Sequence, residues 1–524
     1  MLELPALQKK ENPEKETGIK TAKNGILYIA GQVVASVSVL VLLVLLARLL
    51  QPSNFGLYAI IIAFYTLLGI CGNFGIGTAI RKKLPELTTK EERSELIGNA
   101  YALAMLIAVI IAVAGVLLSS TIASSVYHQP ELSEALQLAS VLVIFWVFFN
   151  LTISVLVGLD KVKEATIIDL VYSLLQPIAA VSLVILGYGV FGAIAGIAIS
   201  IIIGSILGLY YLSNHLINKI IKPTKKLIKE LLDFSTPIAT SNIAVLGPPN
   251  FAILLLGVYA STIIVGNYNA AYEVGNFVGI IFTSATFILL PVFASTFSKK
   301  ETAANIGKLY NKTIYYTLLF LLPILAYVVG IAQPLMYLLF SKVYSLTPFY
   351  FAIIALGTTL GIFGTYAGTV LVGYGDTRKF MLYQLAIVAI EIILLFALTP
   401  YLKATGVLIS IFLIGPIVLD IIYLKALKKQ FSFNPEVRNL FALMCAAIIT
   451  FILLYAITNA MNQSKFAIIV DLILAVVVYV PLASIFKGIT QKELDFLKSL
   501  CNSYRIGFIV KYILDYAQFF IREK

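Results

Sequence analysis

The sequence predicts an all-α polytopic membrane protein with about fourteen transmembrane helices. Of its 524 residues, 60% are hydrophobic and only 12% are charged, which leaves too little polar surface for a soluble domain. Long apolar runs without polar alternation favour helices over a barrel. Between Asp169 and Lys219, for example, no Asp, Glu, Lys or Arg intervenes, and this stretch is long enough for two helical spans.

Apolar runs bounded by charged or turn-forming residues locate the predicted spans. Six runs precede a basic stretch, at 24–50, 55–80, 97–119, 134–158, 165–186 and 190–213. Eight follow it, at 234–258, 269–297, 312–340, 349–373, 380–400, 404–424, 438–459 and 466–486.

The basic residues test this number of spans and set the orientation, because cytoplasmic loops of membrane proteins carry an excess of Lys and Arg. With a cytoplasmic N-terminus, 34 of the 38 basic residues fall on the cytoplasmic side, and the exceptions are Arg48, Lys342, Lys403 and Lys465. We therefore expect both termini in the cytoplasm. The net charge of +12 then reflects orientation signals facing anionic lipid, and a nucleic-acid partner is unnecessary.

A weak internal repeat divides the first twelve predicted spans into two lobes of six. Leu156-Val157-Gly158 ends the fourth span, and Leu371-Val372-Gly373 ends the tenth, 215 residues later. Gly56-Leu57-Tyr58 similarly matches Gly266-Asn267-Tyr268 at an offset of 210. Because six is even, both lobes begin on the same side of the membrane, so we expect a parallel pseudo-two-fold axis along the membrane normal.

The predicted organisation combines the spans, the repeat and the charged segments. It consists of a cytoplasmic N-terminal tail (1–23), an N-lobe (24–213), a cytoplasmic amphipathic linker (214–233), a C-lobe (234–424), two further helices (425–486) and a cytoplasmic amphipathic tail (487–524). Lysines between apolar residues in the linker and the C-terminal tail predict that both lie on the inner leaflet.

Motifs spread along the chain resemble those of a known family. They are Ala47-Arg48-Leu49-Leu50-Gln51-Pro52, Phe55-Gly56-Leu57-Tyr58, Asn73-Phe74-Gly75-Ile76-Gly77, the Gly-Tyr-Gly-Val-Phe-Gly-Ala stretch from Gly187, and the Leu-Val-Gly turn before Asp376. In these motifs the chain resembles polysaccharide or O-antigen type flippases of the multidrug/oligosaccharidyl-lipid/polysaccharide exporter superfamily. The resemblance implies a V-shaped pair of lobes around a central cavity. It also implies a glycan cargo on polyprenyl phosphate or pyrophosphate, moved from the inner to the outer leaflet.

The resemblance also sets the expected partners and location. We expect a secondary-type transporter in the cytoplasmic membrane that works by alternating access as a monomer, with lipid-linked glycan, membrane lipids and glycan-assembly enzymes as partners. We expect no enzyme activity and no nucleic acid, cofactor or metal. Cys71, Cys445 and Cys501 are scattered, without metal-binding or disulfide spacing.

Polar residues near the first, second and seventh spans are candidates for the wall of the cavity, because a hydrated head group needs hydrogen-bonding and cationic partners. These candidates are Gln32, Arg48, Asn73, Arg81, Asn242 and Asn250. Arg48 and Arg81 are the phosphate candidates, and snorkelling to lipid head groups is the alternative for each. Pro248 and Pro249 predict a break or bend in the seventh span, which is either a hinge or a fixed kink.

Polar groups inside other spans are candidates for proton or ion coupling, because a carboxylate in hydrocarbon usually faces a cavity or a partner. They are Glu273, Glu391, Asp169, Gln176 and Gln384. At the offset of 215, Asp169 matches Gln384 and Gln176 matches Glu391, so acid and amide are exchanged between the lobes. A proton-binding Glu391 competes with a neutral Glu391 that is hydrogen-bonded within its lobe.

Two other functions remain open. A small-molecule or multidrug cation antiporter of the same superfamily shares the architecture, but such antiporters commonly carry an N-lobe carboxylate and the first span has no acid. A membrane-embedded glycan polymerase or glycosyltransferase needs catalytic residues on a sizeable outer loop. The longest predicted outer loop, 120–133, offers only His128, Glu131 and a few hydroxyl groups. The sequence therefore favours the flippase.

Overall fold

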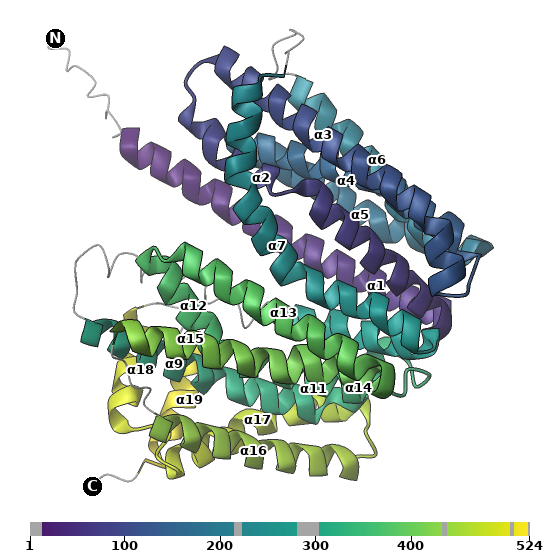
Figure 1. Cartoon of the computed structure of the whole chain (residues 1–524). Helices are drawn as coiled ribbons and strands as arrows, with labels where there is room; N and C mark the ends of the chain where they lie inside the picture. Colours follow the sequence, from purple (N-terminus) through teal and green to yellow (C-terminus); the bar gives the residue numbers. More distant parts are fainter. Residues whose placement is uncertain (1–12, 214–222, 280–302, 432–436, 504–507, 522–524) are drawn as a thin grey trace, which may run out of the picture. The chain divides into compact units, whose positions relative to one another are not determined.

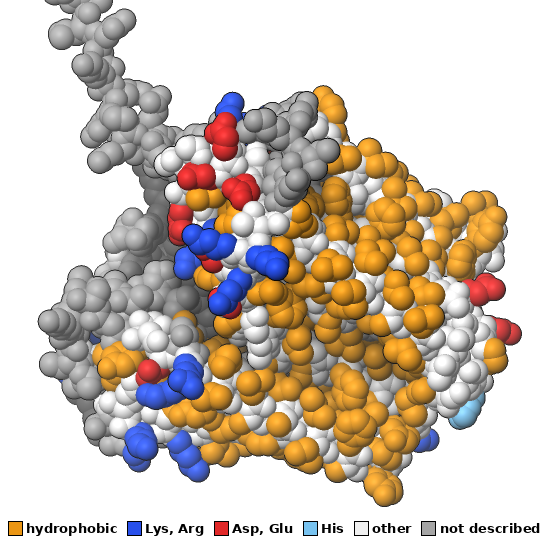
Figure 2. All heavy atoms as spheres, turned by 45° about the horizontal axis from the view of Figure 1, so that its top comes forward, with side chains coloured by type: hydrophobic (Ala, Val, Ile, Leu, Met, Phe, Trp, Pro, Cys, Tyr) orange, Lys and Arg blue, Asp and Glu red, His pale blue; other side chains and the backbone are white. Residues whose placement is uncertain are grey.

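A computed structural model describes residues 13–213, 223–279, 303–431, 437–503 and 508–521, and Figure 1 shows their helices. Every regular element within these ranges is a helix. In this part of the chain, 11 helices are long and apolar enough to cross a membrane. Figure 2 shows hydrophobic side chains over a broad area of one face, with most of the Lys and Arg in view gathered outside it. The protein is a multi-pass, all-α membrane protein.

Two of the 11 candidate spans each cover two predicted ones wholly or in large part. Leu27–Asn73 covers most of the first and second, and Val162–Ser213 contains the fifth and sixth. The predicted eighth span, 269–297, lies partly outside the described residues, so the number fourteen stays a prediction.

The chain forms two compact units, and the first consists of Met1–Leu49 and Ile61–Ile243. The elements of this stretch are α1 (Pro13–Asn73), α2 (Ile76–Lys83), η1 (Leu84–Glu86), α3 (Lys90–Thr121), η2 (Ile122–Val126), α4 (Leu132–Gly158), α5 (Val162–Leu183), η3 (Val184–Tyr188), α6 (Gly189–Ser213) and the start of α7 (Lys225–Tyr259). Its core joins apolar residues of α2, α3 and α4 to Leu231 of α7, and α5 packs along α6.

The second unit consists of Leu50–Ile60 and Ala244–Lys524. After α7, residues 262–279 are helical. The elements that follow are α9 (Ala303–Gly330), α10 (Ala332–Phe340), α11 (Thr347–Leu360), α12 (Ile362–Tyr374), α13 (Thr377–Leu402), α14 (Ala404–Val407), η4 (Leu408–Ile414), α15 (Gly415–Phe431), α16 (Val437–Ala460), α17 (Lys465–Ile485), α18 (Gln491–Ser503) and α19 (Phe508–Gln518). Helix α16 packs against α9 and α17, and α12 packs against α15. The predicted boundaries between lobes and extra helices stay predictions.

Several predicted spans have a different internal structure from the one expected. The second is interrupted after Asn73 by positive φ angles at Phe74 and Gly75 (42° and 70°), because the Asn-Phe-Gly motif forms a turn there. Conversely, α7 continues through Pro248 and Pro249, so the predicted break is absent, and a bend or hinge at these prolines stays a prediction. Membrane helices tolerate proline because neighbouring groups satisfy the freed backbone carbonyls.

The two segments expected to lie on the inner leaflet contact the rest of the protein, and their place at the leaflet stays a prediction. Residues 214–222 of the predicted linker lie outside the described residues, and 225–233 form the first turns of α7. There Ile228, Leu231 and Leu232 pack into the core of the first unit. Helices α18 and α19 pack on α17, where Leu494 and Ala517 meet Val480. Burial against protein removes these apolar faces from water as effectively as lipid would.

The internal repeat reappears in the backbone. After α4, the amide of Lys161 donates to the carbonyl oxygen of Leu156 (2.8 Å). After α12, 215 residues later, the amide of Asp376 donates to the carbonyl oxygen of Leu371 (3.0 Å). The residue before each donor has a positive φ, 60° and 99°. Both helices therefore end in the same left-handed turn, which satisfies their last carbonyls.

A second equivalent contact joins the helices that follow these turns. A Cβ at Gly192 would lie 3.1 Å from the carbonyl carbon of Leu183, and one at Gly406 would lie 2.7 Å from that of Leu398. Leu183 and Leu398 differ by 215 positions, and the two glycines differ by 214. Both units thus bring paired helices into contact at a glycine.

Candidate functional site

A hydrogen bond between α1 and α5 joins two of the residues that the sequence singled out. The amide Nε2 of Gln32 donates to Asp169 Oδ2 over 2.8 Å. One residue before Gln32, a Cβ at Gly31 would collide with the side chain of Thr166, so glycine permits this close approach. Two turns further along, Ser38 Oγ donates to the carbonyl oxygen of Ser173 (2.6 Å). Helices α1 and α5 are therefore fastened by polar contacts over about two turns.

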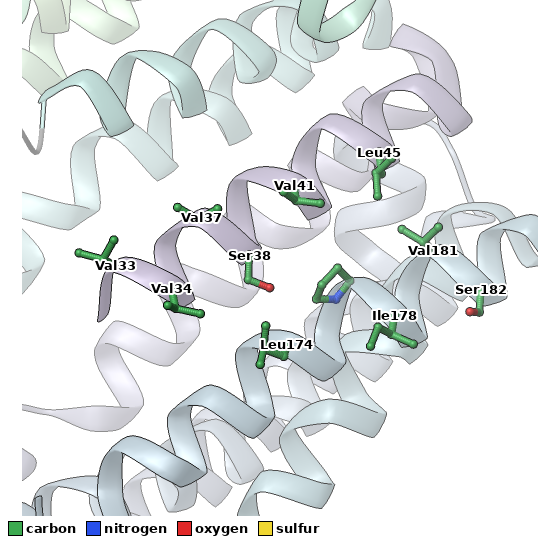
Figure 3. Close-up of a pocket in the computed structure, with 11 residues that line it drawn as sticks. Val33, Val34, Val37, Ser38, Val41, Leu45, Leu174, Ile178, Val181 and Ser182 are labelled. Carbon is green, nitrogen blue, oxygen red and sulfur yellow. The ribbon is translucent and has the colours of Figure 1, made fainter. Parts of the chain in front are cut away.

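An apolar groove continues from this polar pair between the same two helices (Figure 3). Its volume is about 770 Å³, and its lining is Val33, Val34, Val37, Ser38, Val41, Leu45, Leu174, Pro177, Ile178, Val181 and Ser182. Eight of these eleven side chains are branched aliphatic ones. Since Gln32 adjoins the groove in sequence, the first unit presents a polar end and an apolar body side by side.

The phosphate candidates lie apart from each other on different helices. Arg48 is exposed on α1, 16 residues beyond Gln32, or about 24 Å along the helix. Arg81 lies on α2, where its Nε donates to Ser154 Oγ of α4 (3.2 Å). The two lysines after Arg81 have partners of their own in the first unit: Lys82 lies 4.7 Å from the centre of the Phe234 ring, and Lys83 pairs with Glu230 (3.4 Å).

The remaining polar candidates lie at other places in the two units. Asn73, at the end of α1, and Asn242, on α7, are both partly exposed. Asn250 lies in the second unit, where its Nδ2 donates to the carbonyl oxygen of Leu246, one helical turn earlier (2.8 Å). Gln176 is buried on α5, two turns beyond Asp169.

The coupling candidates of the second unit occupy two helices. Gln384 of α13 accepts a hydrogen bond from the Tyr423 hydroxyl of α15 (3.2 Å). Glu391 lies two turns further along α13, and its Oε1 is so close to Gly415 that a Cβ at this glycine would collide with it. Glu273 lies in the 262–279 helix and is partly exposed. Their roles in coupling stay predictions.

An acid outside the predicted site makes a specific backbone contact. The amide of Gly364 donates to Asp420 Oδ1 over 2.5 Å, just after the break at Gly361 that separates α11 from α12. The predicted span at 349–373 had no such break. The signal was present in the spacing of Gly357, Gly361 and Gly364, which places three small residues on one helical face.

A family model for polysaccharide biosynthesis proteins matches residues 45–347, which is more than half of the chain. The chain belongs to the polysaccharide biosynthesis protein family. The part of this family member that matches contains Arg48, Arg81 and Asp169. Gln32 lies before it, and Asp420 lies after it.

A curated relative and solved structures extend the comparison. This family member is 22% identical over 299 residues to the succinoglycan biosynthesis transport protein ExoT of Rhizobium meliloti (strain 1021), over 57% of the chain and 58% of the relative's length. The chain thus matches little more than half of that relative.

The fold resembles the lipid II flippase MurJ in an inward closed conformation, with a TM-score of 0.71, 16% identity and coverage of 88% of this chain and 98% of that one. It also resembles an inward-facing multidrug resistance MATE family transporter of the MOP superfamily, with a TM-score of 0.62, 18% identity and coverage of 76% and 94%. At these identities the likeness shows the fold of a MOP-type transporter and no more.

Proposed function

We propose that this protein translocates a lipid-linked oligosaccharide or polysaccharide repeat unit, carried on polyprenyl phosphate or pyrophosphate, from the inner to the outer leaflet. It does so by alternating access, as a transporter without enzyme activity. The family match over residues 45–347 carries this proposal. The name of the relative ExoT, a transport protein of succinoglycan biosynthesis, supports it. In this proposal the protein lies in the cytoplasmic membrane as a monomer with both termini in the cytoplasm, and it receives its cargo from glycan-assembly enzymes.

The first unit suits a cargo that is polar at one end and apolar at the other. Amide and carboxylate groups such as those of Gln32 and Asp169 can form hydrogen bonds with sugar hydroxyls. The aliphatic groove beside these two residues offers no such partners and disfavours sugar hydroxyls. A branched isoprenoid chain matches the branched lining of this groove. We therefore propose that the groove holds the first isoprene units of the carrier while the glycan meets the polar pair.

The phosphate of the cargo needs a cation that can donate hydrogen bonds to its oxygens. Arg81 uses Nε to reach Ser154, and its guanidinium has further donors for phosphate oxygens. Lys82 and Lys83 are engaged with Phe234 and Glu230. We propose Arg81 as the first phosphate contact at the cytoplasmic side and Arg48 as the second, at the outer side. An anionic head group moving outward gains about 2.3 kcal/mol per charge per 100 mV of inside-negative potential.

The function is tested by depleting the protein in its native cell and measuring lipid-linked glycan on each leaflet. We expect the glycan to accumulate on the cytoplasmic leaflet. If depletion leaves the glycan distribution unchanged and alters only resistance to organic cations, the protein is a multidrug antiporter and the flippase proposal is wrong.

The role of the groove is tested by filling it. Val37→Trp and Val41→Trp should each lower glycan translocation about tenfold, because an indole occupies the space of the isoprenoid chain. The matched controls are Val109→Trp and Val113→Trp on α3, which change equally exposed valines outside the groove. Equal translocation by all four variants would exclude the groove as the carrier site.

A further inference from the structure

One peptide unit in the second unit is held at both of its polar atoms by side chains of two other helices. The hydroxyl of Tyr310, on α9, donates to the carbonyl oxygen of Phe363 (2.8 Å). The next backbone amide, that of Gly364, donates to Asp420 of α15 (2.5 Å). The Phe363–Gly364 peptide therefore lies in a clamp formed by Tyr310 and Asp420.

The clamp lies at a break in a membrane-spanning segment. Helix α11 ends at Leu360, Gly361 has φ −78° and ψ 7°, and α12 begins at Ile362. Amides in the first turn of a helix lack carbonyl partners within that helix, and hydrocarbon offers no water to replace them. The Asp420 side chain supplies a partner at the positive end of α12.

Close backbone packing surrounds the break. A Cβ at Gly364 would lie 2.8 Å from the backbone nitrogen of Asp420, and one at Gly361 would lie 3.3 Å from Pro416 Cβ. The facing segment is also irregular, because η4 is π-helical before α15 begins at Gly415. Irregular turns of this kind occur frequently at functional sites.

The first unit lacks this arrangement at the equivalent place. Phe149 of α4 is 215 positions before Gly364, and α4 continues unbroken past it. The small and the large residue of the contact are exchanged between the units. In the first unit Gly204 contacts Phe149, whereas at the equivalent positions of the second unit Leu419 contacts Gly364. The position equivalent to Asp420 is Ser205, a buried hydroxyl without a hydrogen-bond partner.

The offset between the units also changes at this point. It is 214 between Gly192 and Gly406, and 215 between Gly204 and Leu419. The π-helical η4 lies between Gly406 and Leu419, and a π turn holds one residue more than an α turn. The offset first falls from 215 to 214 between Leu183 and Gly192, where the first unit has its own π-helical turn, η3. The first unit thus folds without the break and the clamp, so their presence in the second unit calls for another explanation than folding.

We propose that Tyr310 and Asp420 are positioning residues of a hinge at Gly361, which hold α12 against α15 in one state of the transport cycle and release it in another. This inference rests on the proposed transport function. In this proposal the clamp acts on the helix angle and not on the cargo. Its strength sets how readily α12 changes its angle to α11, and hence the rate of the conformational step.

The clamp is tested first without any substrate, by amide hydrogen exchange of the purified protein in lipid nanodiscs. Tyr310→Phe and Asp420→Val should speed exchange in the peptides that cover 361–368 about tenfold, because each removes one hydrogen bond from the clamp. Asp420→Asn keeps an acceptor oxygen at this position and should give a smaller increase.

Two matched controls are available in the same unit. Tyr327, also on α9, donates to the carbonyl oxygen of Ile468 (3.0 Å), and Asp471 accepts from the hydroxyl of Thr458. Tyr327→Phe and Asp471→Asn should leave exchange at 361–368 as it is in the unaltered protein. If the controls and the clamp variants give the same exchange, the hinge does not exist.

A transport measurement distinguishes a hinge from a merely structural contact. In proteoliposomes, Tyr310→Phe and Asp420→Asn should change the maximal rate of glycan translocation at least about fivefold with the apparent KM unchanged, because in this proposal the clamp does not act on the cargo. Faster exchange with an unaltered maximal rate would overturn the inference. If the unaltered protein moves no glycan, the proposed function fails by itself, while the exchange experiment still decides whether α11 and α12 are hinged.

Discussion

At the residue scale, the hydrogen bond between Gln32 and Asp169 should contribute measurably to the stability of the protein. Gln32→Leu leaves the carboxyl group of Asp169, in a membrane-spanning helix, without its amide partner, and an acceptor left without a partner away from water costs about 1–3 kcal/mol. Thermal unfolding in detergent should show a lowered Tm. The control, Gln463→Leu, removes an exposed amide contact with Asn459 (3.2 Å) and should change stability by less than about 0.5 kcal/mol. Equal Tm values for both variants would mean that the pair contributes no stability.

Asp376, outside the membrane-spanning segments, links charge to stability. Hydrogen bonds from Lys379 and Gln430 lower the pKa of its carboxyl group. A lowered pKa in the folded protein contributes stability above the ordinary Asp value of about 3.9, and this contribution is lost as the pH falls through the lowered value. The Tm of Asp376→Asn should therefore lie below that of the unaltered protein at pH 7, and the difference should vanish in acid. A difference that persists in acid would contradict this linkage.

At the element scale, two helical segments related by the repeat pack against each other. A Cβ at Gly56 would overlap the carbonyl oxygen of Thr262, and one at Gly266 would overlap that of Pro52. Both contacts relate by the offset of 210, since 52 and 56 correspond to 262 and 266. The matching Gly-x-Tyr motifs are thus similar in sequence, and each glycine also packs against the carbonyl oxygen four residues before the other.

This crossing predicts a sharp difference between glycines. Gly266→Ala forces the two backbones apart and should cost about 1–3 kcal/mol, measured as a lowered Tm. The control is Gly279→Ala, whose Cβ would lie 3.6 Å from Thr358 Cγ2, an ordinary contact distance. Should Gly266→Ala be as stable as Gly279→Ala, the close crossing is absent.

At the scale of the whole molecule, the distribution of Lys and Arg predicts the orientation. In a chain whose Cys71, Cys445 and Cys501 are replaced by alanine, Lys403→Cys should react with a membrane-impermeant maleimide in intact cells. Lys226→Cys should react only after lysis. Both positions are exposed, so access depends on the side of the membrane. The reverse labelling pattern would invert the topology and the direction of transport.

The sequence by itself determined the class of protein and most helix positions. Hydrocarbon forces each backbone segment to satisfy its own hydrogen bonds, so apolar length is a local property. The same holds for the kink inside α1, where Gln51, before Pro52, has a φ of 61°. The repeat was visible for the same reason, because its turns depend on residues a few positions apart. At Pro248 and Pro249 similar local signals predicted a break or bend; the helix continues without a break through both, and the bend stays a prediction.

Only the tertiary structure decided which polar groups meet. Gln32 and Asp169 are 137 residues apart, and Gly364 and Asp420 are 56 apart. Whether such groups touch depends on how each helix is rotated and where it crosses its neighbour, and packing at glycines such as Gly31 and Gly364 sets both. Hydropathy records that a residue lies in the membrane, but it does not record which way its side chain faces.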